Sequence, residues 1–333
     1  MLLISILGFL FLVAVMLLGI NSGCIITPVS AEMRDYILDS NTITDVNNFL
    51  ANYNSLLPTF RGHSTTKPPG TLLFFYFMNK ITNVIVNITL DSIAIRFGIS
   101  FEYGTRPVGI IFTGVIMSLI GVMSIISLYY VGQKIYDEKV GMCSCLSLLF
   151  VPSVVLFTPT IDQMYMFIAI TSFLLFVYGL RARKKMRHIF FLSSGFLLSL
   201  GLFMNFGLFP MVVFNLLFYM VHTRRCKLKT RVRVPSELVF FFFGLSLLFY
   251  LIYLFYNLNI IETLLVTKKA HEIITGQRSY LIWVFFNLYD FFIFLGIPLS
   301  MLFLRKTYYI ALSIKKKSII CLLYTSPSPR DRG

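Results

Sequence analysis

The stretch "VGIIFTGVIMSLIGVMSIISLYYV", from Val108 to Val131, contains 24 residues and no charged side chain. About 20 consecutive apolar residues are enough for a helix to cross the hydrocarbon core of a bilayer. Blocks of similar length recur along the 333-residue chain, of which 57% is hydrophobic and only 13% is charged. Because helices satisfy their own backbone hydrogen bonds in lipid, the sequence predicts an all-α integral membrane protein.

The formal net charge of +15 is concentrated in short loops between these apolar blocks. Four such loops contain 18 of the 29 Lys and Arg residues: Lys134 with Lys139, Arg181–Arg187, Arg224–Arg233 and Arg305–Lys317. Basic residues in short loops stay on the cytoplasmic side, so we place all four loops there. The charge is therefore explained by membrane orientation, and we predict no nucleic-acid partner.

The segments between the basic loops must leave and return to the same side of the membrane. Met142–Leu180 and Ile189–Val221 are each too long for one helix and carry polar or Pro-containing breaks, so we predict two hairpins. Their outward tips are expected at Pro159–Asp162 and near Asn205–Pro210. The last two basic loops are then joined by a span, an outward segment and a second span: Leu238–Tyr256, Asn257–Tyr280 and Leu281–Leu304.

The N-terminal part of the chain is assigned by alternating membrane sides from the cytoplasmic loop at Lys134 back toward residue 1. Leu2–Ile20 is uncharged and is expected to be an uncleaved first span, although "TPVSA" after it keeps cleavage open. Asn21–Gly70 then lies outside. Thr71–Leu90 must start and end on the same side, and it contains Lys80 and three asparagines, so we expect a helix in the outer interface. The prediction is about eight transmembrane helices plus external juxtamembrane helices in the first loop.

We expect residues 1–320 to form a single membrane domain. The segment "CLLYTSPSPRDRG", Cys321 to Gly333, departs abruptly from the preceding composition and resembles a translated adapter sequence, so we expect residues 321–333 to be non-native and further spans to follow residue 320 in the full protein. The five cysteines are scattered without a second pair to complete a zinc site, and we interpret them as structural.

Three motifs in this order resemble the GT-C superfamily of lipid-linked-sugar glycosyltransferases, which includes protein O-mannosyltransferases and aminoarabinose transferases; the nearest likeness is to actinobacterial membrane mannosyltransferases. They are "AEMRDYILD" after the first span, "GHSTTKPPGTLLFF", which is similar to the family's "HPPG" or "KPP" turn, and "FTPTIDQMYMF", which is similar to its Pro-x-x-Asp motif. A fourth segment, Arg278–Gly296, resembles a late span of the actinobacterial members. The resemblance extends from Glu32 to Gly296.

The resemblance implies an active site on the non-cytoplasmic side that moves a hexose from a polyprenyl phosphate to a glycan or protein acceptor. The membrane would be the plasma membrane in a prokaryote or the endoplasmic reticulum in a eukaryote. A cation beside the phosphate would stabilise the leaving group, and Lys67 suits this role. Pro68 and Pro69 restrict the backbone around it, and Gly70 allows a close turn into the interfacial helix. His63 and Arg278 are further candidates for binding the donor phosphate.

The candidate catalytic residues are three carboxylates: Glu32, Asp35 and Asp162. A carboxylate near the acceptor would take its proton during transfer. Glu32 and Asp35 are three residues apart, so a helix would present both to one side, and Tyr36 could orient Glu32. Members of the superfamily often have an Asp-Glu pair here, whereas Ala31 precedes Glu32, so which acid is the base stays open.

Simpler interpretations exist for most of these residues. Lys67 and His63 could contact lipid headgroups, Arg278 could be an interfacial anchor, and the acids of the first loop, including Asp39 and Asp45, could be a solvated helix face. Asp162 is different, since an acid between two apolar runs is costly and usually functional. The alternative function is a transporter or a non-catalytic membrane protein, but no internal repeat is evident.

We predict no metal site. Some superfamily members use a divalent cation, but the acid pair that would bind one is not evident, so a cation requirement stays open. No nucleotide-binding glycine loop is recognisable either. A lipid-linked donor would explain the lack of the Asp-x-Asp signature found in enzymes that use nucleotide sugars.

Overall fold

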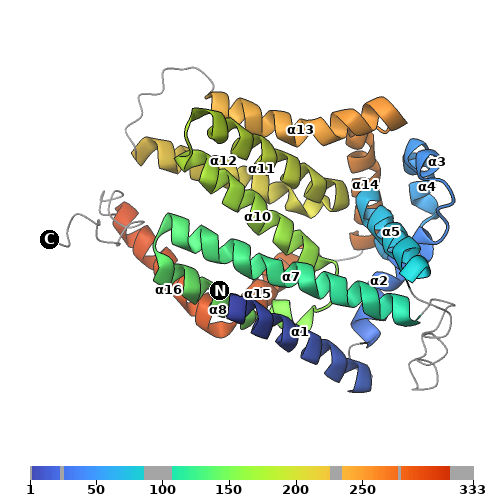
Figure 1. The fold of residues 1–333 in the computed structure, drawn as a ribbon, viewed down its shortest axis with the longest axis horizontal. Coiled ribbons are helices and arrows are strands. Elements are labelled where there is room, and N and C mark those ends of the chain that lie inside the picture. The colour runs from blue at the N-terminus through green and yellow to red at the C-terminus, as the bar shows by residue number, and fades with distance from the viewer. Residues whose placement is uncertain (1, 23–25, 86–106, 226–234, 277–278, 316–333) are drawn as a thin grey trace.

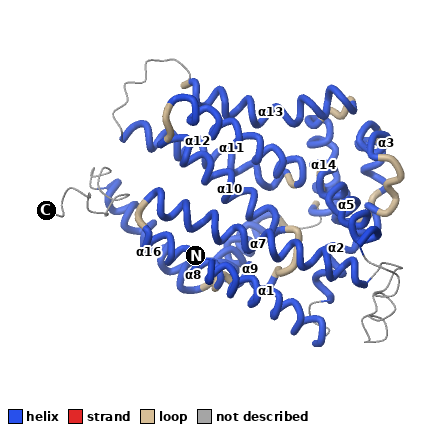
Figure 2. The backbone as a smooth tube through the Cα atoms, in the orientation of Figure 1, coloured by secondary structure: helices blue, strands red, loops and turns tan. Residues whose placement is uncertain are grey.

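The computed structural model of the chain describes residues 2–22, 26–85, 107–225, 235–276 and 279–315 (Figure 1). Within these ranges every regular element is a helix, and the remaining residues form loops and turns (Figure 2). The prediction of an all-α membrane protein is therefore confirmed for the part of the chain that the structure describes.

Five described helices are long and apolar enough to cross a membrane. They are α7 (Pro107–Ile135), α10 (Asp162–Arg181), α11 (Lys184–Met204), α12 (Phe209–Arg225) and α13 (Ser236–Tyr256). Together they form most of the bundle in Figure 1. In α11 and α13, Gly195 and Gly244 each lie against backbone atoms of the other helix, where any side chain would collide. Small residues of this kind allow membrane helices to pack backbone to backbone.

The number of helices that meet the criteria for spanning is smaller than the eight expected. A sixth span results if α14 (Ile260–Thr275) and α15 (Tyr280–Leu295) are counted as one element bent by 99°. In α1 (Leu2–Ser22) the segment that qualifies as apolar among the described residues is the shorter Ile4–Val15. The other differences arise where two expected spans are interrupted.

A proline and a glycine interrupt these two expected spans. The first limb of the hairpin Met142–Leu180 divides into α8 (Glu138–Leu149) and the short α9 (Pro152–Leu156). Pro152 cannot donate the backbone hydrogen bond that would continue α8, and Val151 before it is extended. The segment Leu281–Leu304 is likewise divided between α15 and α16 (Ile297–Lys315), because Gly296 between them has φ = +91°.

The first loop folds into a set of short helices packed on one end of the bundle. They are α2 (Ile26–Ser40), α3 (Val46–Ala51), α4 (Tyr53–Leu56), η1 (Leu57–Thr59), η2 (Gly62–Thr66) and α5 (Pro69–Ile85). Their buried side chains, among them Tyr36, Tyr53 and Phe75, share one core with Ile161 and Tyr165 at the start of α10. The helices of the loop are thus held in a fixed position relative to the bundle.

The helix ends that flank the first three predicted basic loops lie at the opposite end of the bundle, whereas Arg305–Lys315 of the fourth belongs to α16 (Ile297–Lys315). In Figure 1, the α7–α8 and α10–α11 turns and the facing ends of α12 and α13 lie at the left, whereas α2–α5 and α14 lie at the right. The second predicted hairpin is confirmed as α11, the turn η3 (Phe206–Leu208) and α12, with its tip on the right. The alternation of sides inferred from the basic loops therefore agrees with the helix arrangement.

Candidate functional site

The turn that contains the "GHSTTKPPG" motif is fastened to α2 by two carboxylates. Asp39, which is 2% exposed, accepts hydrogen bonds from the guanidinium of Arg61 at 2.5 Å and from its backbone N–H at 2.9 Å. One turn earlier in α2, Asp35 Oδ2 accepts a hydrogen bond from the backbone N–H of His63 at 3.0 Å. Between these two anchors, a Cβ atom on Gly62 would lie 2.9 Å from Asp35 Oδ2, so a small residue suits the position.

Lys67 follows this turn, and its backbone is fixed in position. Its backbone is extended (φ −112°, ψ 151°), as expected for a residue that precedes a proline. Its carbonyl oxygen accepts a 2.7 Å hydrogen bond from the hydroxyl of Tyr53, which is fully buried. Burial, together with the nearby Asp39 carboxylate, raises the pKa of Tyr53 well above its usual value, so this hydroxyl remains a donor at neutral pH.

The Lys67 side chain is half-buried and extends toward the start of α10. Its Nζ atom lies 6.0 Å from the centre of the Tyr165 ring, a cation–π geometry. The Tyr165 hydroxyl is 3.0 Å from Thr71 Oγ1, which donates a 2.6 Å hydrogen bond to the carbonyl oxygen of Met204. This network joins α5, α10 and α11 beneath the lysine.

Gly70 brings the first turn of α5 into contact with the end of α11. A Cβ atom at this position would lie 2.6 Å from the carbonyl oxygen of Phe203 and 2.9 Å from its carbonyl carbon. The neighbour is backbone and cannot move aside as a flexible side chain would. Gly70 lies inside α5 and its φ is not positive, so the approach of α11, and not a special backbone turn, is what requires a glycine here.

Asp162 is the first residue of α10 and is exposed. An acid in the first helical turn interacts favourably with the helix dipole. Its Oδ2 accepts a 3.4 Å hydrogen bond from the hydroxyl of Thr160. The adjacent Gln163 is instead buried and donates to the Val154 carbonyl oxygen at 3.0 Å. The buried Gln163 thus holds the α9–α10 turn in place, while the Asp162 carboxylate remains exposed.

The outward segment predicted between Asn257 and Tyr280 forms α14, which makes up one wall of the site. In Figure 1, α14 runs across the ends of the bundle helices. Its buried Thr263 donates a 2.7 Å hydrogen bond to Asn54 Oδ1, which ties the helix to α4. Lys268 lies one helical turn further along, and its Nζ atom is 3.6 Å from Glu272 Oε1, with both side chains largely exposed.

These elements surround a cavity of about 830 Å³, which we call the loop–bundle cavity. Its volume lies within the usual range for sites that bind small molecules. The polar and charged residues that line it come from α2, the 62–67 turn, the starts of α10 and η3, and α14: Asp35, His63, Thr66, Lys67, Thr160, Asp162, Asn205, Thr267, Lys268, His271 and Thr275.

Four of the six residues predicted from the sequence line this cavity: Asp35, His63, Lys67 and Asp162. The backbone of Glu32 belongs to α2, one turn before Asp35, but its side chain lies outside the described residues, and so does Arg278. The structure thus brings together residues that are separated by up to 127 positions in the chain.

Two of the other first-loop acids are not a solvated helix face. Asp39 is buried and paired with Arg61, and Asp45 caps α3 by accepting hydrogen bonds from the backbone of Asn47 and Asn48. Tyr36, expected to orient Glu32, is buried with its ring stacked 5.7 Å from that of Phe75. The pattern of acids and aromatic residues alone does not separate these anchoring roles from catalytic ones.

Sequence reasoning missed Lys268, His271 and Thr267. They lie about 200 residues from the "KPPG" turn, in a segment whose only recognised signal was its outward position between two spans. Among the described residues, no group of three or more His, Cys, Asp or Glu side chains is arranged to hold a metal ion.

Comparison with known proteins gives one family match. Residues 103–253 match the family model of dolichyl-phosphate-mannose-protein mannosyltransferase, a region that runs from before α7 to near the end of α13 and contains Asp162 and Asn205. No curated protein and no solved structure gives a significant match. The family match supports the resemblance to the GT-C superfamily and indicates an integral membrane glycosyltransferase of the class that uses lipid-linked sugars.

Proposed function

We propose that the protein transfers a hexose from a polyprenyl-phosphate donor to an acceptor on the non-cytoplasmic side of the membrane, and that the loop–bundle cavity is its active site. The observation that carries the proposal is the meeting of Lys67, Asp35 and Asp162 in one cavity at the end of the bundle opposite the basic loops. The family match to residues 103–253 supports the same class of reaction.

The basic side chains of the cavity suit the phosphate of the donor. Lys67 and Lys268 approach from different elements, and His63 and His271 lie in the same lining. As the bond between the anomeric carbon and the phosphate oxygen breaks, negative charge grows on the phosphate, and the Lys67 ammonium stabilises it. The more exposed Lys268 would contribute mainly to binding of the donor. The fixed backbone of Lys67 limits the reorganisation that this requires.

The carboxylates suit the acceptor side of the reaction. An acceptor hydroxyl would attack the anomeric carbon, its proton would pass to a carboxylate, and polyprenyl phosphate would leave. We retain Glu32 as the first choice for this base and Asp35 as the second. Asp162, on the opposite wall, would organise the site by orienting the acceptor or the Lys67 side chain. The transporter alternative is less well supported, because the described candidates lie at one end of the bundle.

The test replaces each acid by its amide, which keeps shape and removes charge. We expect Glu32→Gln to bind donor without turnover, Asp35→Asn to be slower, and Asp162→Asn to lose both turnover and productive binding. Asp35→Asn keeps an oxygen that can accept from the His63 N–H, so its effect reports on charge rather than on the fold of the turn.

Glu262→Gln is the matched control, since Glu262 is an exposed acid of α14 that does not line the cavity. Transfer is measured in membranes with a radiolabelled polyprenyl-phosphate hexose. If all three cavity variants transfer sugar at the parental rate, the proposed active site is wrong.

A further inference from the structure

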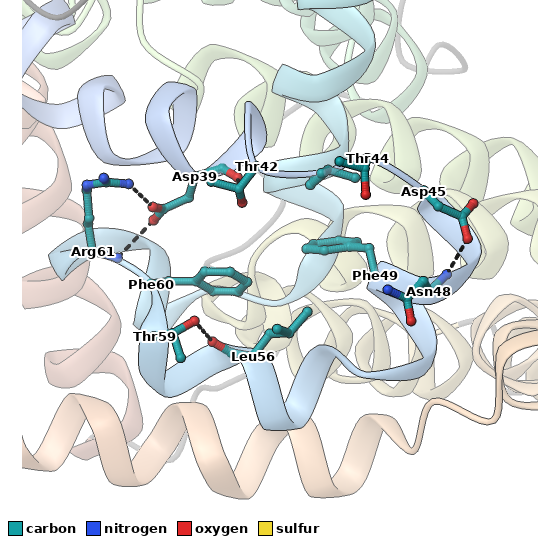
Figure 3. A pocket seen from close by; sticks show the side chains of 11 residues that line it. Asp39, Thr42, Thr44, Asp45, Asn48, Phe49, Leu56, Thr59, Phe60 and Arg61 are labelled. Atoms are coloured by element: carbon teal, nitrogen blue, oxygen red, sulfur yellow. Dashed lines mark hydrogen bonds and ion pairs between the residues drawn. The ribbon is translucent and has the colours of Figure 1, made fainter.

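We propose that a second cavity, between the α2–α3 connection and the Leu56–Arg61 segment, binds an uncharged hexose unit of the acceptor. We call it the α2–α3 pocket. Its volume is about 540 Å³, ample for a ring with its hydrating waters. Figure 3 shows the side chains that line it: Asp39, Thr42, Thr44, Asp45, Asn48, Phe49, Leu56, Thr59, Phe60 and Arg61.

The pocket combines an aromatic interior with a hydroxyl- and amide-bearing rim. The rings of Phe49 and Phe60 lie with their centres 6.3 Å apart and extend into the space between the two segments (Figure 3). Thr44 and Asn48 are exposed at the rim. A pyranose ring presents C–H groups on its faces and hydroxyls around its edge, so it matches an apolar interior with polar groups at the border.

Some polar side chains at the rim can still form hydrogen bonds with a ligand. The hydroxyls of Thr42 and Thr59 already donate to backbone carbonyl oxygens, of Asp39 and Leu56, and so offer only acceptor capacity. The Asn48 side-chain oxygen accepts from Asn52 at 2.7 Å, which directs its amide N–H groups elsewhere. Thr44 and Asn48 are therefore the side chains best placed to bind hydroxyls.

The charge of the pocket excludes the anionic donor. It holds two carboxylates, of Asp39 and Asp45, and one guanidinium, of Arg61, which is paired with Asp39. The loop–bundle cavity holds two lysines and two histidines beside two carboxylates. A phosphate is thus favoured in the loop–bundle cavity, whereas the α2–α3 pocket favours a neutral ligand.

The two cavities share a wall, which is why we assign the hexose to the acceptor. Asp39 and Arg61 line the pocket, while Asp35 and His63, one helical turn and two residues away, line the loop–bundle cavity. A glycan whose hexose rests in the pocket would reach across this wall toward the proposed base. The assignment to an acceptor rests on the proposed function, whereas hexose binding by the pocket does not.

The test measures sugar binding by the full chain purified in detergent. Methyl α-D-mannopyranoside is titrated and its contact with the protein is followed by saturation-transfer NMR. Thr44→Val and Asn48→Ala should each weaken binding about threefold to tenfold, the usual effect of one lost hydrogen bond. Thr307→Val and Asn47→Ala, exposed positions outside the pocket, are the matched controls and should bind as the parent does.

Further arms separate this inference from the proposed function. Hexoside binding is measured without donor, so it reports on the pocket whether or not the chain transfers sugar, and D-glucuronate should bind more weakly than the mannoside because of its carboxylate. A diazirine-bearing mannoside should label the segment 42–61 of the unmodified chain, which removes any dependence on folding of the variants. Parental binding by both Thr44→Val and Asn48→Ala, or labelling confined to other segments, would overturn the inference.

Discussion

The Asp39 carboxylate, buried in α2, accepts hydrogen bonds from both the side chain and the backbone of Arg61, at 2.5 Å and 2.9 Å. The Arg61 side chain is 52% exposed, so solvent screens much of the attraction between the two charges. The backbone hydrogen bond is not replaceable by water in the same way, because Asp39 itself is buried. This pair therefore fixes the wall between the two cavities.

We expect Asp39→Asn to destabilise the protein by about 1–2 kcal/mol, since the amide keeps one acceptor but loses the charge-assisted bond. A double-mutant cycle with Arg61→Gln should give a coupling free energy of about 0.5–1 kcal/mol, the range for a partly exposed pair. Denaturant unfolding in detergent measures both. Asp45→Asn is the control, and equal stability of the two Asn variants would show that the Arg61 contact is unimportant.

Lys67→Ala should reduce transfer by about 2–4 kcal/mol of transition-state stabilisation, the scale for loss of one electrostatic contact. Pro68 and Pro69 remain, so the turn is preserved. Lys67→Arg should recover only part, because a planar fork does not replace a compact ammonium. Lys80→Ala, on an exposed face of α5 outside the cavity, is the matched control. Near-parental transfer by Lys67→Ala would remove Lys67 from the mechanism.

Lys268→Ala should raise the KM for the polyprenyl-phosphate donor about twofold to fivefold with little change in kcat, since an exposed charge contributes modestly to binding. Lys269 is the next residue in α14 and does not line the cavity. Lys269→Ala should therefore leave the KM for the donor unchanged. Steady-state kinetics over a range of donor concentrations distinguish the two. Equal KM values for both variants would mean that α14 does not contact the donor.

The sidedness of the bundle can be tested by cysteine labelling. Ser64, in the motif turn, is fully buried and would not react, so exposed residues are needed. In a cysteine-free background, Asn47→Cys in α3 should react with an impermeant maleimide added outside intact cells, and Lys139→Cys in α8 should react only after permeabilisation. The reverse pattern would place the loop–bundle cavity on the cytoplasmic side.

The stability of the protein should fall at alkaline pH because Tyr53 ionises. Its pKa is raised in the folded state by burial, so its contribution is fully present below the unfolded value of about 10 and is lost as pH rises above it. Thermal melting between pH 8 and 11 should show a decline that is smaller in Tyr53→Phe. That variant should also lose about 1 kcal/mol at neutral pH with its hydrogen bond to Lys67. An unchanged alkaline decline in Tyr53→Phe would assign it to other groups.

Much of the membrane architecture follows from the sequence alone. Apolar length predicts α7, α10 and α13, and the basic loops predict which helix ends share a side, because both depend on local composition. The extended backbone at Lys67 follows from Pro68, since a proline restricts the backbone angles of the residue before it.

The interruptions of two expected spans were less evident, although Pro152 and Gly296 are visible in the sequence. An apolar run around a proline or glycine can form either a kinked helix or two helices, and hydropathy does not distinguish them. The outcome depends on packing: a Cβ atom at Gly296 would lie 3.0 Å from Pro152, so the two breaks meet in space.

The cavities were decided by tertiary structure. The sequence indicated Asp35, Lys67 and Asp162 as candidates, but only the packing of α2, α10 and α14 onto one end of the bundle places them together and adds Lys268. The same packing buries Asp39 against Arg61, 22 residues away, and turns an apparent surface acid into an anchor. Side-chain burial and long-range hydrogen bonds depend on which segments meet, and a local pattern of residue types carries no information about that.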